Sequence, residues 1–236
     1  MKILIIGGNS SLGKSLRPIL SNYAEVITAG RTDCDVHVDL NDPIESINLP
    51  PDIDTIIHTA ASFGGESEKE ILEAESFNVL GTLKLCQKAA NTNITHLILI
   101  STIFVTLEDT SAFYNVYSLS KRHSEDVAKF CCSTHNLPLT ILRPSQIYGA
   151  GDSFRIHQPF FNFLLEKAEK GENITLYGSV DPLRNYIYMD DVVNIISKVV
   201  ITRIEGTYAC TQMADVTYSQ IARAAFDAYK TKGEMR

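Results

Sequence analysis

Residues 97–121 read LILISTIFVTLEDTSAFYNVYSLSK. The first four, Leu97 to Ile100, form a continuous apolar run of strand length, which is typical of a parallel strand buried on both faces. Ser101 and Thr102 follow directly, and the carboxyl ends of such strands are where open α/β sheets place their ligands. The stretch therefore predicts a parallel α/β sheet with polar side chains at the end of a central strand.

Tyr117 and Lys121 lie four residues apart at the start of a helical pattern, so both side chains should share one face of the helix. An ammonium beside a phenol favours the phenolate, and we expect it to lower the tyrosine pKa from about 10. Each feature alone is common on helix surfaces and at helix caps. Their order along the chain, with Thr102 as a hydroxyl donor, favours a proton-transfer site.

The composition is that of an ordinary globular protein, with 44% hydrophobic and 21% charged residues. Its 236 residues can form one large domain, or one domain with a small appendage. The net charge of -7 and the lack of a basic stripe predict that nucleic acid is not a partner. An anionic small molecule is not excluded, because it needs only local positive charge.

Neither the cysteines nor the amino terminus indicates export. The five cysteines show no metal-ligand spacing and no Cys-x-x-Cys pair: Cys34, Cys86, Cys131, Cys132 and Cys210. We expect no metal site, and free thiols in a reducing, cytoplasmic compartment. The apolar start, Ile3 to Ile6, is too short for a signal peptide or a membrane span, so no membrane partner is expected.

A glycine-rich turn follows this first strand: Gly7-Gly8-Asn9-Ser10-Ser11-Leu12-Gly13. Between a strand and a helix, such a turn aims backbone N–H groups and a positive helix dipole at a pyrophosphate. The spacing Gly7-x-x-Ser10-x-x-Gly13 differs from the dinucleotide-binding fingerprint at its middle position, where Ser10 adds a Cβ. Its hydroxyl could also donate a hydrogen bond. The position at the very start of the chain favours a dinucleotide site.

The second strand, residues 25–29, ends at Gly30-Arg31. An acidic residue there usually accepts hydrogen bonds from the adenosine ribose. The charged residue at the end of this strand is instead Arg31, which would suit a 2′-phosphate through charge-assisted hydrogen bonds. A surface arginine after a strand is an equally good interpretation.

The remaining pattern alternates strands with helices, which predicts a doubly wound, Rossmann-like parallel sheet. Strands are expected over 3–6, 25–29, 36–39, 54–58, 97–100 and 139–142, with shorter ones over 174–177, 186–188 and 207–209. Helices are expected over 14–20, 66–91, 117–135, 157–170, 190–202 and 219–229.

His58 lies on an apolar strand and is expected to be a core histidine. The small residues Thr59, Ala60, Ala61 and Ser62 after it would allow close approach of a cofactor or tight packing.

After Arg143 the pattern changes, beginning with a loop over residues 143–149. We expect a dinucleotide-binding domain over 1–149, extended by strands and helices within 174–209. A small substrate-binding region over 150–236 would interleave with it. This region is expected to be shortened, because the chain ends soon after a helix.

With these motifs in view, the chain resembles the extended short-chain dehydrogenase/reductases, which include epimerases, dehydratases and ketoreductases acting on sugar nucleotides. The matching stretches cover nearly the whole chain: Gly7 to Gly13, Asp39-Leu40, His58 to Ala61, Asn78 to Thr82, Ser101-Thr102, Tyr117 to Lys121, Arg143 to Gly149, and Arg184 to Asp191. The resemblance implies NAD(P) as cofactor, a nucleotide-sugar substrate, and a homodimer paired through the helices over 66–91 and 117–135.

The resemblance also implies roles at the matching positions. Thr102, Tyr117 and Lys121 would be catalytic: Thr102 would bind the substrate oxygen, Tyr117 would transfer its proton, and Lys121 would hold the nicotinamide ribose and tune Tyr117. The implied cofactor contacts are Gly7, Asn9, Ser10, Ser11, Leu12, Gly13, Arg31, Asp39, Leu40, Thr59, Ala60, Ala61, Asn78, Tyr117, Lys121, Pro144 and Ile147. The implied substrate contacts are Ser62, Thr102 and Arg184, although Arg184 could also be a solvated loop residue.

Departures from the family pattern narrow the reaction. Dehydratases of this family carry an Asp-Glu pair after the central strand, where this chain has Ile103 and Phe104, and fused epimerase-reductases carry a cysteine near Ile103. A ketoreductase or a 4-epimerase remains, and Arg31 favours NADP(H) and hence a reductase. Other departures are Ser10, a short connection from Thr102 to Tyr117, Thr106, and Asn185 in place of an aspartate. Ser10 and the short carboxyl-terminal region leave open a regulator that binds the nicotinamide nucleotide without turnover.

Overall fold

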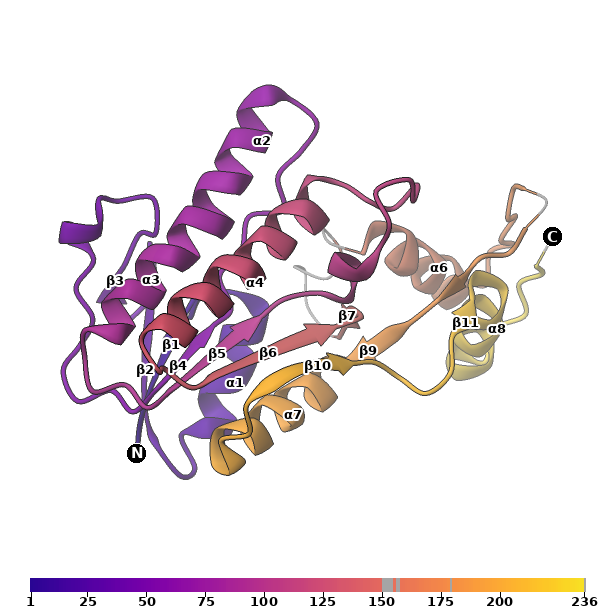
Figure 1. Cartoon of the computed structure of the whole chain (residues 1–236). Coiled ribbons are helices and arrows are strands. Elements are labelled where there is room, and N and C mark those ends of the chain that lie inside the picture. The colour runs from indigo at the N-terminus through magenta and orange to yellow at the C-terminus, as the bar shows by residue number, and fades with distance from the viewer. Residues whose placement is uncertain (150–154, 156–157, 179, 236) are drawn as a thin grey trace. The chain divides into compact units, whose positions relative to one another are not determined.

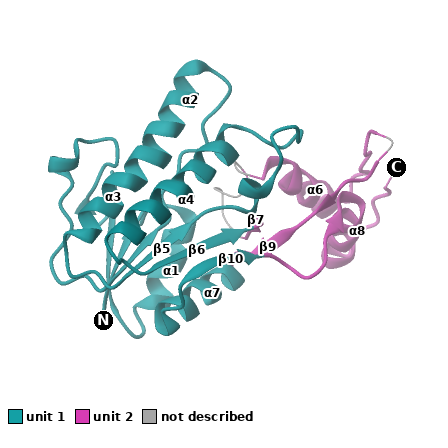
Figure 2. Cartoon of the chain, viewed as in Figure 1, with its two compact units in different colours: residues 1–144, 190–210 teal, residues 145–189, 211–236 magenta. Residues whose placement is uncertain are grey.

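The computed structural model describes residues 1–149, 155, 158–178 and 180–235 (Figure 1). The chain divides into two compact units, coloured separately in Figure 2. The first unit holds residues 1–144 and 190–210, and the second holds residues 145–189 and 211–236. The second unit therefore consists of a segment inserted into the first unit together with the carboxyl-terminal residues.

A seven-stranded sheet forms the centre of the first unit, in the order β10-β6-β5-β4-β1-β2-β3. All neighbours pair in parallel, so each connection must cross over the sheet. The strands are β1 (Lys2–Ile6), β2 (Glu25–Gly30), β3 (Val36–His37), β4 (Thr55–His58), β5 (His96–Ile100), β6 (Leu139–Pro144) and β10 (Gly206–Cys210). The chain order reverses beside β1, which is the switch point where such sheets bind ligands.

Helices cover both faces of this sheet, with α2, α3 and α4 on one face and α1 and α7 on the other (Figure 1). Their bounds are α1 (Ser11–Leu20), α2 (Glu68–Glu75), α3 (Gly81–Ala90), α4 (Val116–Thr134) and α7 (Met189–Thr202). Every residue of β4 and β5 is buried, which explains the apolar runs Ile56–Ile57 and Leu97–Ile100 within them. The expected Rossmann-like, doubly wound α/β fold is thus confirmed.

The helix expected over residues 66–91 is interrupted. A capping box of Ser67 and Glu70 starts α2, and a π-helical turn, η2 (Ser76–Leu80), separates it from α3. The apolar spacing predicted one continuous helix and did not indicate this turn. Such turns are frequent at functional sites. Two short 3₁₀ helices, η1 (Ile44–Ser46) and η3 (Ile103–Thr106), complete the first unit.

The described residues of the second unit form two small sheets and two helices. β7 (Gln146–Tyr148) pairs in parallel with β9 (Tyr186–Tyr188), and β8 (Leu183–Arg184) pairs antiparallel with β11 (Val216–Thr217). α6 (Pro159–Glu169) packs on α8 (Tyr218–Tyr229) around Leu164, Ala168 and Phe226. Among the described residues, no helix has the length and apolar character needed to span a membrane.

Two sequence-based expectations need correction in this unit, and a third lies outside the described residues. The loop expected over 143–149 contains β7, because Gln146 and Ile147 pair with the β9 strand. The strand expected over 174–177 is wrong, since Ile174 forms only an isolated bridge with Met235. The expected helix start at His157 lies outside the described residues, and the helix is seen from Pro159.

Candidate functional site

The glycine turn closes tightly between β1, α1 and the segment after β4. Gly7 has φ +88°, and a Cβ there would lie 2.6 Å from the backbone N of Ala60. A Cβ on Gly13 would lie 2.5 Å from the Gly7 carbonyl oxygen. Both positions therefore require glycine, and the backbone of the turn can approach a ligand closely.

Ser10 has a structural explanation. Its Oγ accepts a hydrogen bond from the Gly13 N–H at 3.0 Å, which makes it the N-cap of α1, and it lies 3.1 Å from Thr59 Oγ1. The first turn of α1 carries no acidic side chain, so its positive dipole end is not neutralised locally. These features fit a dinucleotide pyrophosphate, with Ser10 serving as a cap in place of the middle glycine.

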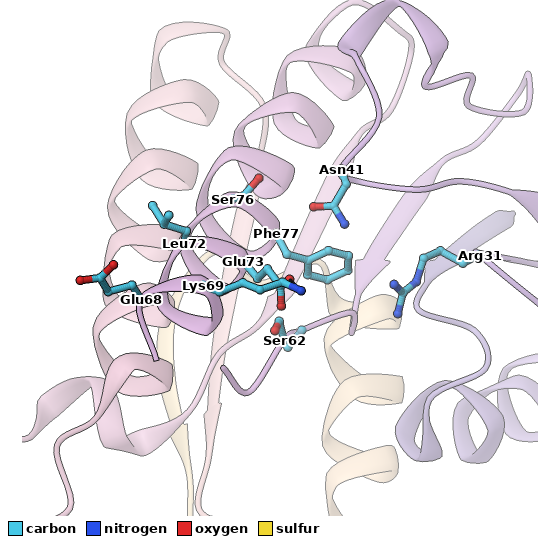
Figure 3. A pocket seen from close by; sticks show the side chains of 10 residues that line it. Arg31, Asn41, Ser62, Glu68, Lys69, Leu72, Glu73, Ser76 and Phe77 are labelled. Atoms are coloured by element: carbon cyan, nitrogen blue, oxygen red, sulfur yellow. Dashed lines mark ion pairs between the residues drawn. The ribbon is translucent and has the colours of Figure 1, made fainter. Parts of the chain in front are cut away.

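A pocket of about 810 Å³ lies in the first unit, between the end of β2, the segment after β4, and α2 with the π turn (Figure 3). It is lined by Arg31, Asn41, Ala61, Ser62, Glu68, Lys69, Leu72, Glu73, Ser76 and Phe77. The Arg31 guanidinium carbon lies 5.8 Å from the centroid of the Phe77 ring. Lys69 is paired with Glu73 at 3.7 Å, so Arg31 is the lining cation best placed to bind an anionic ligand.

Asp39 and Leu40, implied to contact adenine, lie between β3 and the π turn. Asp39 accepts a hydrogen bond from Asn41 N–H, and the Leu40 carbonyl accepts one from Lys84 Nζ at 2.7 Å. A Cβ on Gly81 would lie 2.8 Å from Leu40 Cβ. Gly81 is therefore the close-packing position that allows Leu40 to sit against the helix.

Asn78 lies in the π turn and is only 2% exposed. Its side-chain oxygen accepts from Ser62 N–H at 2.8 Å, and its nitrogen donates to the Ser62 carbonyl at 2.7 Å and to Ser120 Oγ at 2.9 Å. The amide thus ties the segment after β4 to helix α4. Its implied contact with the cofactor stays a prediction.

Tyr117 lies in the first turn of α4, which Asn115 caps through its bond with Ser118 N–H. The Tyr117 ring stacks on Phe63, with centroids 4.8 Å apart and an interplanar angle of 27°. Burial raises the pKa of Tyr117 to about 12. The expected lowering of this pKa is therefore wrong for this structure, because burial outweighs any effect of the neighbouring ammonium.

The Lys121 ammonium joins α4 to the end of β5. Lys121 is 1% exposed, and its Nζ donates to the Ile100 carbonyl at 2.7 Å. Burial lowers the pKa of Lys121 to about 8, an effect partly opposed by Glu125. Because Thr102 stands two residues after Ile100, this bond brings the end of β5 and the start of α4 together.

Thr102 is 6% exposed and acts as the N-cap of η3, accepting a hydrogen bond from Phe104 N–H at 3.3 Å. In helix α4, Arg122 holds the same turn through the carbonyl oxygens of Val105 and Leu107. Lys121 thus anchors the end of β5 to α4, and Arg122 anchors the η3 turn to the same helix.

Other buried polar groups surround this centre. His58 is a core histidine, as expected: it is 1% exposed, its Nε2 lies 3.1 Å from Thr82 Oγ1, and burial lowers its pKa to about 3. Thr82 Oγ1 lies 3.0 Å from Ser124 Oγ. Sequence reasoning missed Glu125, which is bonded to Arg143 by both carboxylate oxygens. Its spacing of four residues after Lys121 was the available signal.

The remaining candidates divide between the two units. Pro144 ends β6 in the first unit, whereas Ile147 and Arg184 belong to the second. Arg184 Nε donates to Tyr218 Oη at 3.0 Å, and its guanidinium lies 5.3 Å from the Tyr218 ring. Asn185, the departure from the family pattern, bonds to Gln212 and Asp215 and so holds the strand β9 segment in place.

Comparisons with known proteins agree with this geometry. Over residues 3–208 the chain matches the model of the NAD dependent epimerase/dehydratase family. CDP-abequose synthase of Salmonella typhimurium is 22% identical, over 64% of this chain and 49% of its own length. GDP-6-deoxy-D-talose 4-dehydrogenase of Aggregatibacter actinomycetemcomitans is 27% identical, over 87% of this chain and 72% of its own length. The chain thus spans about half the length of the first protein and nearly three quarters of the second.

Solved structures share the fold. UDP-N-acetylglucosamine 4-epimerase from Bacillus cereus has a TM-score of 0.78 at 22% identity, covering 100% of this chain and 85% of the other. The Bordetella bronchiseptica enzyme WbmF, solved in complex with NAD⁺, has a TM-score of 0.81 at 18% identity, covering 99% and 79%. The family match, the glycine turn and the strand-to-helix site together show that this chain belongs to the NAD-dependent epimerase/dehydratase family, an enzyme family with a Rossmann-like fold.

Proposed function

We propose that the chain is an NADP-dependent oxidoreductase that reduces the 4-keto group of a nucleotide-linked sugar. The observation that carries this proposal is the bond between Lys121 Nζ and the Ile100 carbonyl. It fixes the cation beside the strand end that bears Thr102, with Tyr117 one helical turn away. A hydroxyl, a phenol and an ammonium are thereby available around one reacting carbonyl.

The residues would act as follows. Thr102 would donate a hydrogen bond to the keto oxygen, and Tyr117 would donate the proton that makes it a hydroxyl. With a pKa raised to about 12, Tyr117 is protonated at neutral pH, which suits a proton donor. Lys121 would hold the nicotinamide ribose and stabilise the phenolate left behind. Bound nicotinamide cofactor supplies the hydride.

The cofactor is proposed to bind along the glycine turn, with its adenosine end near Arg31, Asp39 and Leu40. Steric evidence supports this placement, because a Cβ at Gly7 or Gly13 would fill the turn. Two relatives, from Streptomyces sp and Streptomyces bikiniensis, carry the name dTDP-4-dehydro-6-deoxy-D-allose reductase, and each is 27% identical. Ile103 and Phe104, in the 3₁₀ helix after Thr102, cannot transfer protons, which disfavours dehydration.

The alternatives are a sugar-nucleotide 4-epimerase and a nucleotide-binding regulator without turnover. The test is to incubate the protein with NADPH and a 4-keto-6-deoxy nucleotide sugar, and separately with NAD⁺ and UDP-glucose. A reductase consumes one NADPH for each hydroxyl formed. An epimerase interconverts 4-epimers with no net change in cofactor, and a regulator binds nucleotide but converts neither substrate. Mass spectrometry of co-purified nucleotides would identify the base.

We expect Arg31→Ala to weaken NADPH binding by about 10- to 100-fold and NADH binding far less. Charge-assisted hydrogen bonds to phosphate contribute about 1.5–3 kcal/mol, and Arg31 lines the pocket at the end of β2. Fluorescence titration with each cofactor measures the two affinities. Lys69→Ala is the matched control, because Lys69 lines the same pocket but is paired with Glu73. Equal affinity of the unaltered protein for both cofactors would contradict the preference.

We also expect a homodimer formed through α2, α3 and α4. Three apolar side chains, on α2, the π turn before α3, and α4, are exposed in the single chain: Leu72 is 70%, Leu80 53% and Phe130 74% exposed. Pairing would remove these side chains from water. Light scattering at micromolar concentration should give twice the mass of one chain, and Phe130→Glu should shift it toward the monomer. A monomeric unaltered protein would refute this expectation.

A further inference from the structure

The interior face of α4 carries a buried acid that the proposed reaction does not use. Glu125 lies one helical turn after Lys121 and is 1% exposed. Arg143 on β6 donates to both of its carboxylate oxygens, from Nε at 2.9 Å and from the terminal nitrogen at 2.6 Å. Such a two-point contact fixes the orientation of a carboxylate as well as its charge.

Most buried ion pairs do not increase stability over an apolar pair, because both charges must lose their hydration. The Glu125–Arg143 pair therefore needs another reason to be in this position. Lys121, four residues earlier, shares the same buried face of the helix, and its charge interacts with that of Glu125. We propose that Glu125, held by Arg143, is a positioning residue that keeps the Lys121 ammonium charged and directed at the end of β5.

The surrounding charges support this assignment. Burial lowers the pKa of Lys121 to about 8, and Glu125 is the group that opposes the shift. Tyr117, on the same helix, is neutral at pH 7 because burial raises its pKa. His58, facing from β4, is neutral because its pKa is lowered to about 3, by burial and then by the charge of Lys121. Glu125 is thus the acid that favours the charged form of Lys121.

Arg143 determines the state of Glu125. Burial alone would raise the pKa of the carboxyl, but the hydrogen bonds of Arg143, the Ser101 hydroxyl, and the charges of Arg143 and Lys129 lower it. Glu125 therefore stays ionised at every pH at which Lys121 titrates. Lys129 contacts the same carboxylate at 3.3 Å from the exposed side of the helix. Asp126, the residue after Glu125, is exposed. Its charge affects the pKa of Arg143 and not that of Lys121.

The inference rests on the proposed role of Lys121, but it can be tested without turnover. In protein labelled with ¹³C and ¹⁵N at lysine, the Nζ signal of Lys121 is identified by its loss in Lys121→Met. We expect Glu125→Gln to move the titration of this signal to lower pH by about one unit or more. Asp126→Asn, which removes a neighbouring exposed charge, should leave it in place. An unchanged titration in Glu125→Gln would overturn the proposal.

A second measurement follows catalysis. If the protein reduces 4-keto sugars, the pH above which kcat/KM falls should move down in Glu125→Gln by the same amount as the Lys121 titration. At pH 7.5 this corresponds to about a threefold loss, which grows to about tenfold well above pH 8. Glu125→Asp keeps the charge and should restore both values, which a role in folding alone would not require. Rate loss without a shift of either pH profile would contradict the proposal. If no substrate is turned over, the NMR titration still decides it, and only the proposed function fails.

If Glu125→Gln does not fold, as judged by thermal melting, Arg143→Lys provides the same test. It keeps a cation near Glu125 but loses the two-point contact. The Lys121 titration should then move to lower pH by a smaller amount than in Glu125→Gln. A Lys121 titration identical to that of the unaltered protein would again overturn the proposal.

Discussion

Replacing Tyr117 with phenylalanine is expected to lower turnover by about 10²–10⁴-fold, the usual contribution of a positioned acid or base. The substitution removes one oxygen and keeps the ring that stacks on Phe63, so folding should survive. NADPH affinity should change little, because the glycine turn and the Arg31 pocket are untouched. The loss should therefore appear in kcat, which reports a missing transition-state interaction.

The matched control is Tyr114→Phe. Tyr114 lies three residues earlier and stacks under the Arg122 guanidinium at 5.0 Å, away from the proposed proton path. It should keep near-normal turnover of the 4-keto nucleotide sugar with NADPH. The turnover of Thr102→Ala should lie between those of Tyr117→Phe and Tyr114→Phe, since this change removes one hydrogen bond to the substrate oxygen. Near-normal turnover by Tyr117→Phe would show that Tyr117 is not the proton donor.

The sequence predicted the sheet well because its central strands β4 and β5 are buried throughout and β1 nearly so. Runs such as Leu97 to Ile100 leave little choice of conformation, and the parallel order follows from the alternation with helices. The glycine turn was predicted for a similar reason, because Gly7 and Gly13 are required sterically. Ser10 looked like a defect in this turn, and its role as a helix cap depends on a hydrogen bond to Gly13 that only the folded chain shows.

Properties that depend on burial were predicted less well. The face shared by Tyr117 and Lys121 was anticipated, yet the pKa of Tyr117 is raised and not lowered, because helical spacing does not reveal desolvation. The same limit explains why Glu125 was missed. On a helix with many polar residues, an acidic residue such as Glu125 is expected to be solvent-exposed. The partner of Glu125, Arg143, is 18 residues away in the chain. The contact exists only because β6 lies next to β5 in the sheet.

The buried pair also allows a strong prediction about stability. Arg143→Met should lower the free energy of unfolding at pH 7 by about 3 kcal/mol, the lower end of the range for removing one partner of a buried pair. The lower end applies because the Arg143 side chain is 24% exposed, whereas that of Glu125 is 2% exposed. Lys129→Met is the control, since its exposed contact with the same carboxylate should contribute about 0.5 kcal/mol or less.

The pH dependence distinguishes charge from packing. In the unaltered protein the pKa of Glu125 is lowered, so its contribution is present at neutral pH and is lost as pH falls through the folded value. In Arg143→Met, burial should raise this pKa above its ordinary value of 4.5, so acid relieves the unpaired charge. The two denaturation free energies, measured in urea, should therefore converge as pH falls from 7 toward about 4.5. A difference that stays constant over this range would mean that Arg143 stabilises the fold by packing its side chain against β6 and α4 and not by neutralising Glu125.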